Sequence, residues 1–349
     1  MKNSLFPPDI HKINSGLQSV KVVFAALFYF ENYKTEEKRK SIQSFLDEFI
    51  DNFGDDFNSF RIDGTAHEWT GKNLKRQLLT IRKKLAKTGL YSEYTFHFAH
   101  EDAYKAATTL GIFAHAFMNT EKAVCGFILP FDLALEKKDF IKKFFLKTCD
   151  ALSVDQAYGG LTLGDRANYY FDGRAHDDRK RINEIQNLLL QNSFFDFLHT
   201  DMMDLPNLSN SDEFRKWAVA ASYGYVQKPG KKSLELKVDP NTVEFKPMNK
   251  VWGLRWPSAM NFLGENWVAK IGGFNFIKKQ LNNFEVEKLE KGIYMGASKL
   301  PYISPQELKE IAQISSKYRL SPDLKSSHDL IMRPILNPKK TLEWIRRFD

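Results

Sequence analysis

The chain has 349 residues, of which 51 are Lys or Arg and 43 are Asp or Glu, so its formal net charge is +8 at pH 7. With 43% hydrophobic and 14% aromatic residues it can bury a large core, which excludes a disordered chain and a coiled-coil rod. Its two cysteines are too few for a disulfide-rich secreted fold or a four-thiolate zinc site.

The longest uninterrupted hydrophobic stretch, residues 22–30, is roughly half as long as a membrane-spanning helix. Pro7, Pro8 and Asp9 precede it, and no small-residue cleavage site follows it, so it is not typical of a signal peptide. We therefore expect an unprocessed cytoplasmic protein with no membrane partner.

The N-terminal half alternates between predicted strands and amphipathic helices. Residues 22–30 are rich in valine and aromatics, which predicts a strand buried on both faces. Helical spacing of apolar residues predicts helices at 35–53, 72–87 and 137–152. Aromatic and β-branched residues predict further strands at 91–101, 104–117, 123–135 and 156–163. Gly159 and Gly160 in the last of these indicate that another element packs closely there.

In the C-terminal half the sequence predicts mostly short helices and strands. A helix is expected at 179–190, and a strand near 251–256. Two short helices at 265–270 and 274–281, a hairpin at 284–296 and a helix at 304–318 follow. Ser304 and Glu307 fit a capping box, and Pro305 suits the first helical position.

These patterns predict an α+β fold with mixed, largely antiparallel sheets flanked by amphipathic helices. We expect two subdomains, residues 1–165 and 166–349, or one continuous body.

Several short motifs resemble catalytic or metal sites without meeting their requirements. His97 and His100 fall on a predicted strand, where side chains three residues apart point to opposite faces, so they do not bind one ion together. His176 precedes two acids and three cations, which is typical of a helix start. Cys125 and Cys149 lie among apolar residues and are expected to be buried. We therefore expect no catalytic residue, metal or cofactor.

The helix predicted at 72–87 carries seven cations and no acid, which is the strongest nucleic-acid signal in the chain. Lys72, Arg76, Lys83 and Lys87 are the candidate phosphate contacts. No aromatic residue is interleaved for base stacking, and a solvated outer face is the more frequent meaning of such a pattern. Nucleic acid is therefore the less favoured partner.

Residues 194–213 stand in a basic chain but contain five acids and neither Lys nor Arg. Apolar side chains stand among the acids without helical or strand spacing. Such a segment suits a loop that docks on a basic protein surface, with apolar anchors and steering carboxylates. An ordinary connector packed into the core is the equal alternative. The candidate contacts are Asp196, Phe197, Asp201, Met202 and Asp204.

Most of the chain resembles one known family, and the C-terminal third does so most closely. The resemblance begins at 251–264, where a strand is expected to end in an Asn-Phe-Leu-Gly turn at 261–264. It continues with Trp267, the Gly272-Gly273 pair, the hairpin and the terminal segment 344–349. The strand around Gly159 also fits its central region. This order resembles the type VI secretion immunity family associated with VRR-type nuclease effectors, formerly a domain of unknown function.

The resemblance implies a non-catalytic cytoplasmic protein that binds a cognate toxic effector and occludes its active or DNA-binding surface. It brings no catalytic residues, and the short motifs described above supply none either. An inhibitor of a DNA-binding surface is expected to be acidic, so in this basic chain the contact must come from a local acidic surface or from shape. The alternative is a nucleic-acid-binding protein that uses the helix at 72–87.

Overall fold

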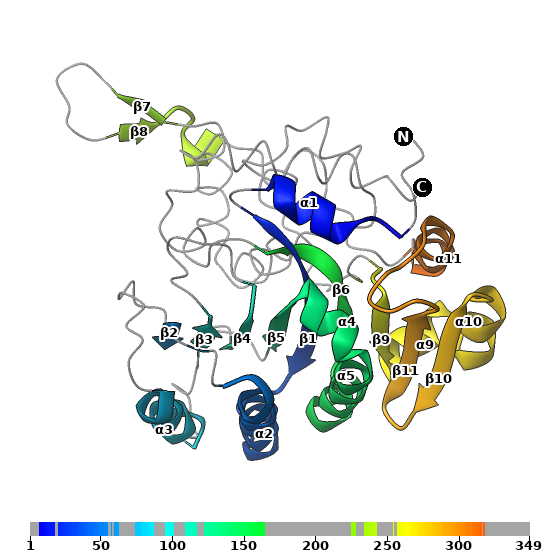
Figure 1. The fold of residues 1–349 in the computed structure, drawn as a ribbon, viewed down its shortest axis with the longest axis horizontal. Coiled ribbons are helices and arrows are strands. Elements are labelled where there is room, and N and C mark those ends of the chain that lie inside the picture. The colour runs from blue at the N-terminus through cyan, green and yellow to red at the C-terminus, as the bar shows by residue number, and fades with distance from the viewer. Residues whose placement is uncertain are drawn as a thin grey trace.

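The computed structural model describes residues 7–17, 20–54, 57, 59–62, 74–86, 95–100, 109–116, 122–164, 225–227, 234–242, 254, 257–315 and 317. Within this part, one nine-stranded sheet forms the centre of the molecule, and every strand pair is antiparallel (Figure 1). Its strand order is β10-β11-β9-β6-β1-β5-β4-β3-β2. The α+β prediction, with antiparallel pairing and flanking helices, is confirmed.

The sheet strands are β1 (Lys21–Glu31), β2 (Ser59–Ile62), β3 (Thr95–Ala99), β4 (Gly111–Ala116), β5 (Lys122–Pro130), β6 (Gln156–Gly164), β9 (Met260–Gly264), β10 (Phe284–Leu289) and β11 (Gly292–Ala297). A separate hairpin contains β7 (Tyr225–Gln227) and β8 (Leu234–Leu236). The described helices are α1 (Ile10–Gly16), α2 (Glu36–Phe53), α3 (Leu74–Leu85), α4 (Phe131–Glu136), α5 (Lys138–Leu152), α9 (Glu265–Ile271), α10 (Phe274–Gln280) and α11 (Pro305–Ser315).

Strand β1 lies at the centre of the sheet and is buried on both faces, as predicted. Its even-numbered residues from Phe24 to Phe30 join the main hydrophobic core, and Val23 and Tyr29 belong to a second cluster on the other face. Because both faces are covered, a continuous apolar run is the pattern that this position requires.

Helices α2 and α5 cover the face of the sheet that carries the main core. Phe45 of α2 stacks on Phe144 of α5 with ring centroids 5.3 Å apart, and Phe28 of β1 lies against Phe45 at 5.9 Å. Helix α3 adds Ile81 and Leu85 to the same core. Residues from α1, α9, α10 and α11 pack instead on a separate cluster near the β9 and β11 end of the sheet.

The predicted strand 123–135 is too long. Strand β5 ends at Pro130 and α4 begins at Phe131, because proline has no N–H to continue the ladder and Phe131 and Ala134 bury one side of a helical turn. The predicted turn at 261–264 is also wrong. These residues form β9, which is buried along its length and pairs with β6 and β11.

The sheet continues across the predicted boundary between residues 165 and 166. Strand β6 lies directly before it, and β9 lies nearly a hundred residues after it, yet Gln156 pairs with Leu263 and Gly159 with Met260. The expected close approach at the glycines is confirmed, since a Cβ on Gly160 would lie 2.3 Å from Ser258 Oγ. The division into two subdomains stays a prediction.

Candidate functional site

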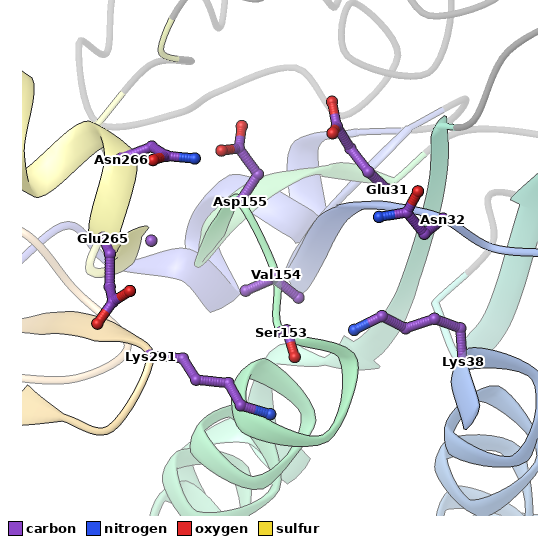
Figure 2. Close-up of a pocket in the computed structure, with 10 residues that line it drawn as sticks. Glu31, Asn32, Lys38, Ser153, Val154, Asp155, Glu265, Asn266 and Lys291 are labelled. Atoms are coloured by element: carbon purple, nitrogen blue, oxygen red, sulfur yellow. The ribbon is translucent and has the colours of Figure 1, made fainter. Parts of the chain in front are cut away.

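A polar pocket of about 300 Å³ lies where segments that are distant in sequence meet (Figure 2). Its walls come from the β1–α2 connection, the α5–β6 turn, the start of α9 and the β10–β11 turn. The lining residues are Glu31, Asn32, Lys38, Ser153, Val154, Asp155, Gly264, Glu265, Asn266 and Lys291.

The base of the pocket is the C-terminal end of α5. Ser153 adopts the left-handed conformation, with φ of 43°, and its N–H donates to the Asp150 carbonyl at 3.0 Å. The Val154 N–H donates to the Cys149 carbonyl at 3.1 Å. These two bonds form a Schellman motif, which ends the helix and turns the chain into β6.

Two lysines from other elements reach the same helix end. Lys38 Nζ donates to the Leu152 carbonyl, and Lys291 Nζ donates to the Asp150 carbonyl at 3.1 Å. The C-terminal end of a helix carries partial negative charge, so both ammonium groups are favourably placed. Lys38 is only 9% exposed, and this burial lowers the pKa of its amine below the usual value.

The opposite side of the pocket carries carboxylates. Asp155 accepts a hydrogen bond from Trp267 Nε1 at 2.8 Å, which ties the α5–β6 turn to α9. Glu31 and Glu265 stand on either side of it and are exposed. Gly264 precedes Glu265 in the chain, and a Cβ there would lie 3.0 Å from the Val154 carbonyl oxygen, so a larger residue would have to shift the α5–β6 turn.

The pocket therefore presents three carboxylates above two lysines that are held by main-chain carbonyls. Its described lining includes neither histidine nor cysteine, so the groups gathered there are suited to binding polar or charged groups. Sequence reasoning missed this site because its residues come from positions 31 to 291 and share no motif. Lys38, a cation in the first turn of a helix, was the one unusual local signal.

The predicted partner contacts Asp196, Phe197, Asp201, Met202 and Asp204 lie outside the described residues, as do Lys72 and Lys87. The other two nucleic-acid candidates, Arg76 and Lys83, lie on α3 and are exposed. Two of the four candidate phosphate contacts therefore lie on α3, as predicted, and the other two lie outside the described residues.

The histidines and cysteines considered as catalytic or metal-binding residues lie apart from this pocket or outside the described residues. His97 lies within β3, while His100 follows the end of that strand and is half-buried. His176 lies outside the described residues. Cys125 and Cys149 are fully buried, and burial raises the pKa of both thiols, as expected for structural cysteines.

The described residues contain neither a metal-binding cluster nor a membrane-spanning helix. No group of three or more His, Cys, Asp or Glu side chains there is arranged to hold a metal ion. No helix in the same part of the chain is long and apolar enough to cross a membrane.

Comparison with known proteins finds a likeness in fold and none in sequence family. No family model matches the chain, and no curated protein matches it. Among solved structures, the Pseudomonas aeruginosa T6SS protein PA0821 has a similar fold, with a TM-score of 0.65. The two chains share 12% sequence identity, and the alignment covers 95% of this chain and 85% of that chain. At this identity the likeness shows a common fold over nearly the whole chain.

Proposed function

We propose that this chain is a non-catalytic immunity protein that binds a type VI secretion effector and neutralises it by stoichiometric occlusion. The observation that carries the proposal is the fold shared with a T6SS protein over 95% of the chain. The resemblance in the Asn-Phe-Leu-Gly segment, Trp267 and the glycine pair points to the same system.

The contacts of these motif residues support a structural role for them. Asn261 accepts from the Ser258 N–H at 2.8 Å and donates to the Ser258 carbonyl at 2.6 Å, which fixes the entry into β9. Trp267 is buried and bonded to Asp155, and Gly272 and Gly273 adopt positive φ between α9 and α10. The motif residues thus stabilise the fold and contribute no reactive group, which is consistent with a protein that acts by binding.

The cognate effector is proposed to be a DNA-targeting nuclease, and the acidic-apolar segment 194–213 is proposed to contact it. A nuclease presents a basic groove, and this segment contains five acids and neither Lys nor Arg. Reversing the charge of Asp201 and Asp204 should weaken the complex, measured by calorimetry, and leave thermal unfolding of the free chain unchanged. Equal affinity would remove the segment from the interface.

The test of the function is rescue. Expression of the toxin domain encoded beside this chain's gene should stop growth, and co-expression of this chain should restore it. The purified chain should form an equimolar complex with a catalytically disabled toxin domain. Rescue without a complex, or a complex without rescue, would contradict neutralisation by occlusion.

A second candidate function is nucleic-acid binding through α3, favoured by the exposed Lys75, Arg76 and Lys83. Phosphate contacts release counterions, so binding of this kind weakens steeply as salt increases. Alanine at Arg76 and Lys83 should then reduce both DNA affinity and its dependence on salt concentration. Absence of DNA or RNA binding by the intact chain at low salt removes this candidate.

A further inference from the structure

The outer face of α3 consists of Lys75, Arg76, Leu79, Arg82 and Lys83. Leu79 is 52% exposed, the highest value among the large hydrophobic side chains in the described part of the chain. The other four residues lie three or four positions before and after it, so all of them share its side of the helix. An exposed apolar residue is therefore surrounded by four cations.

This face is held in a fixed position by the opposite side of the helix. Leu78, Ile81 and Leu85 are buried in the main core. The buried Arg39 of α2 donates from Nη1 to the carbonyls of Lys84 and Leu85, at 3.1 and 3.2 Å, and so caps the end of α3.

Two lysines supply the accessible positive charge of the outer face. Arg82 is partly committed, since its Nη2 lies 2.8 Å from Asp47 Oδ1 of α2. Lys75 and Lys83 are both exposed and form no ion pair with any described residue.

We infer that the outer face of α3 docks on an acidic protein surface that has an apolar hollow for Leu79. Charge complementarity requires the partner surface to be acidic. A central apolar anchor with charged residues around it is the usual arrangement of a protein–protein contact. Nucleic acid fits less well, because none of the five residues is aromatic and phosphates would leave Leu79 without an apolar partner.

The inference rests on the proposed function and adds a second contact to it. A positive face does not enter a basic DNA groove, so α3 engages the effector outside that groove, whereas the acidic segment 194–213 is the proposed contact with it. Binding to two surfaces of opposite charge also explains how a chain of net charge +8 serves as an inhibitor of a nuclease.

The experiment measures affinity for the catalytically disabled toxin domain by calorimetry. Leu79→Ser and the double variant Lys75→Glu/Lys83→Glu should each weaken binding roughly tenfold or more. Matched controls are Leu135→Ser, another exposed leucine at 37%, and Lys278→Glu/Lys279→Glu, an equal charge change on exposed lysines of α10. Both controls should stay within about twofold of the intact chain.

Leu79→Gln repeats the test with a good helix former, and thermal unfolding of every variant verifies that it folds. If the α3 variants bind as tightly as the intact chain, the inference is overturned and the immunity function stands. If the intact chain does not bind the toxin domain, both the docking role of α3 and the proposed immunity function are overturned. If the intact chain binds a short DNA duplex, and Lys75→Glu/Lys83→Glu abolishes this while Leu79→Ser does not, α3 is a nucleic-acid surface.

Discussion

Lys38 and Arg39 are neighbours on α2 whose side chains reach the C-terminal ends of two different helices. Lys38 donates to the last carbonyl of α5, and Arg39 donates to two carbonyls at the end of α3. Both are buried, at 9% and 2% exposure. One turn of α2 thus joins the two other helices that cover this face of the sheet.

We predict that Lys38→Met destabilises the protein by about 1–2 kcal/mol, because the buried Leu152 carbonyl loses its donor while the apolar stem is conserved. Lys291→Met should cost less than about 0.5 kcal/mol, since Lys291 is only half-buried and water can replace it. Urea unfolding of the two variants measures the difference. Equal costs would mean that the buried contact of Lys38 contributes nothing beyond the exposed one.

Glu307 is a buried carboxylate that accepts hydrogen bonds from two main-chain N–H groups. The N–H groups of Ser298 and Ser304 both lie 2.7 Å from its oxygens, and its own N–H donates to Ser304 Oγ at 3.2 Å, which confirms the capping box. Burial by itself raises the pKa of Glu307, but these hydrogen bonds outweigh it and the pKa is lowered.

Because the folded-state pKa of Glu307 lies below its unfolded value of 4.5, its contribution to stability is present above pH 4.5 and is lost as the pH falls through the folded value. Glu307→Gln should therefore destabilise the protein by about 2 kcal/mol at pH 7 and by less in acid. Thermal unfolding across this pH range tests it, with Glu290→Gln in the exposed β10–β11 turn as control. A constant difference at all pH values would contradict the assignment.

At the scale of elements, the junction between β6 and β9 depends on glycine. A Cβ at Gly160 would lie 2.3 Å from Ser258 Oγ and 3.1 Å from the Ala259 N, so a larger side chain must push the chain before β9 away from the sheet. We predict that Gly160→Val costs about 2–3 kcal/mol, measured as the free energy of unfolding.

The control for that variant is Gly16→Ala at the end of α1, where a Cβ would have no neighbour within 4 Å. It should be neutral or stabilise the protein slightly, because alanine favours the helix more than glycine. If Gly160→Val is as well tolerated as Gly16→Ala, the close approach does not constrain β6.

Elements with one clear periodicity were predictable from the sequence. The central strand, α2 with Thr35 before it and Gly54 after it, α5 and the capped α11 all agree with their expected positions. Helix α4 was missed because its single turn continues an apolar strand without a polar break. At β9 the sequence predicts a turn because asparagine and glycine favour turns, but pairing with β6 and β11 overrides that preference.

The pocket could not be predicted in the same way. Its lysines and carboxylates are brought together by the order of strands in the sheet and by the end of α5, and neither is encoded in a local motif. The basic helix was predictable as a pattern of charge, and helical spacing already separates Leu79 from Leu78 and Ile81. How exposed Leu79 remains, at 52%, depends on what packs around α3 and is known only from the structure.

At the scale of the whole molecule, the sheet links the two halves of the chain. Strands β9, β10 and β11 follow residue 165 in sequence but extend the sheet built from β1 to β6. Met260, Phe262 and Tyr294 from the C-terminal half also lie in the main core with residues of the N-terminal half. Separating the halves would expose the edge of β6 and part of this core, which favours one cooperative unit over two independent subdomains.

We therefore predict a single unfolding transition, and the chain carries natural probes for each half. Both cysteines, Cys125 and Cys149, belong to the first 165 residues and are fully buried, so their labelling by a thiol reagent in urea reports that half. All tryptophans except Trp69 belong to the second half, so fluorescence reports mainly on it. Thiol labelling and fluorescence should have the same midpoint. If the thiols become reactive at a urea concentration where fluorescence is still native, the halves unfold separately, and the pairing of β6 with β9 is too weak to couple them.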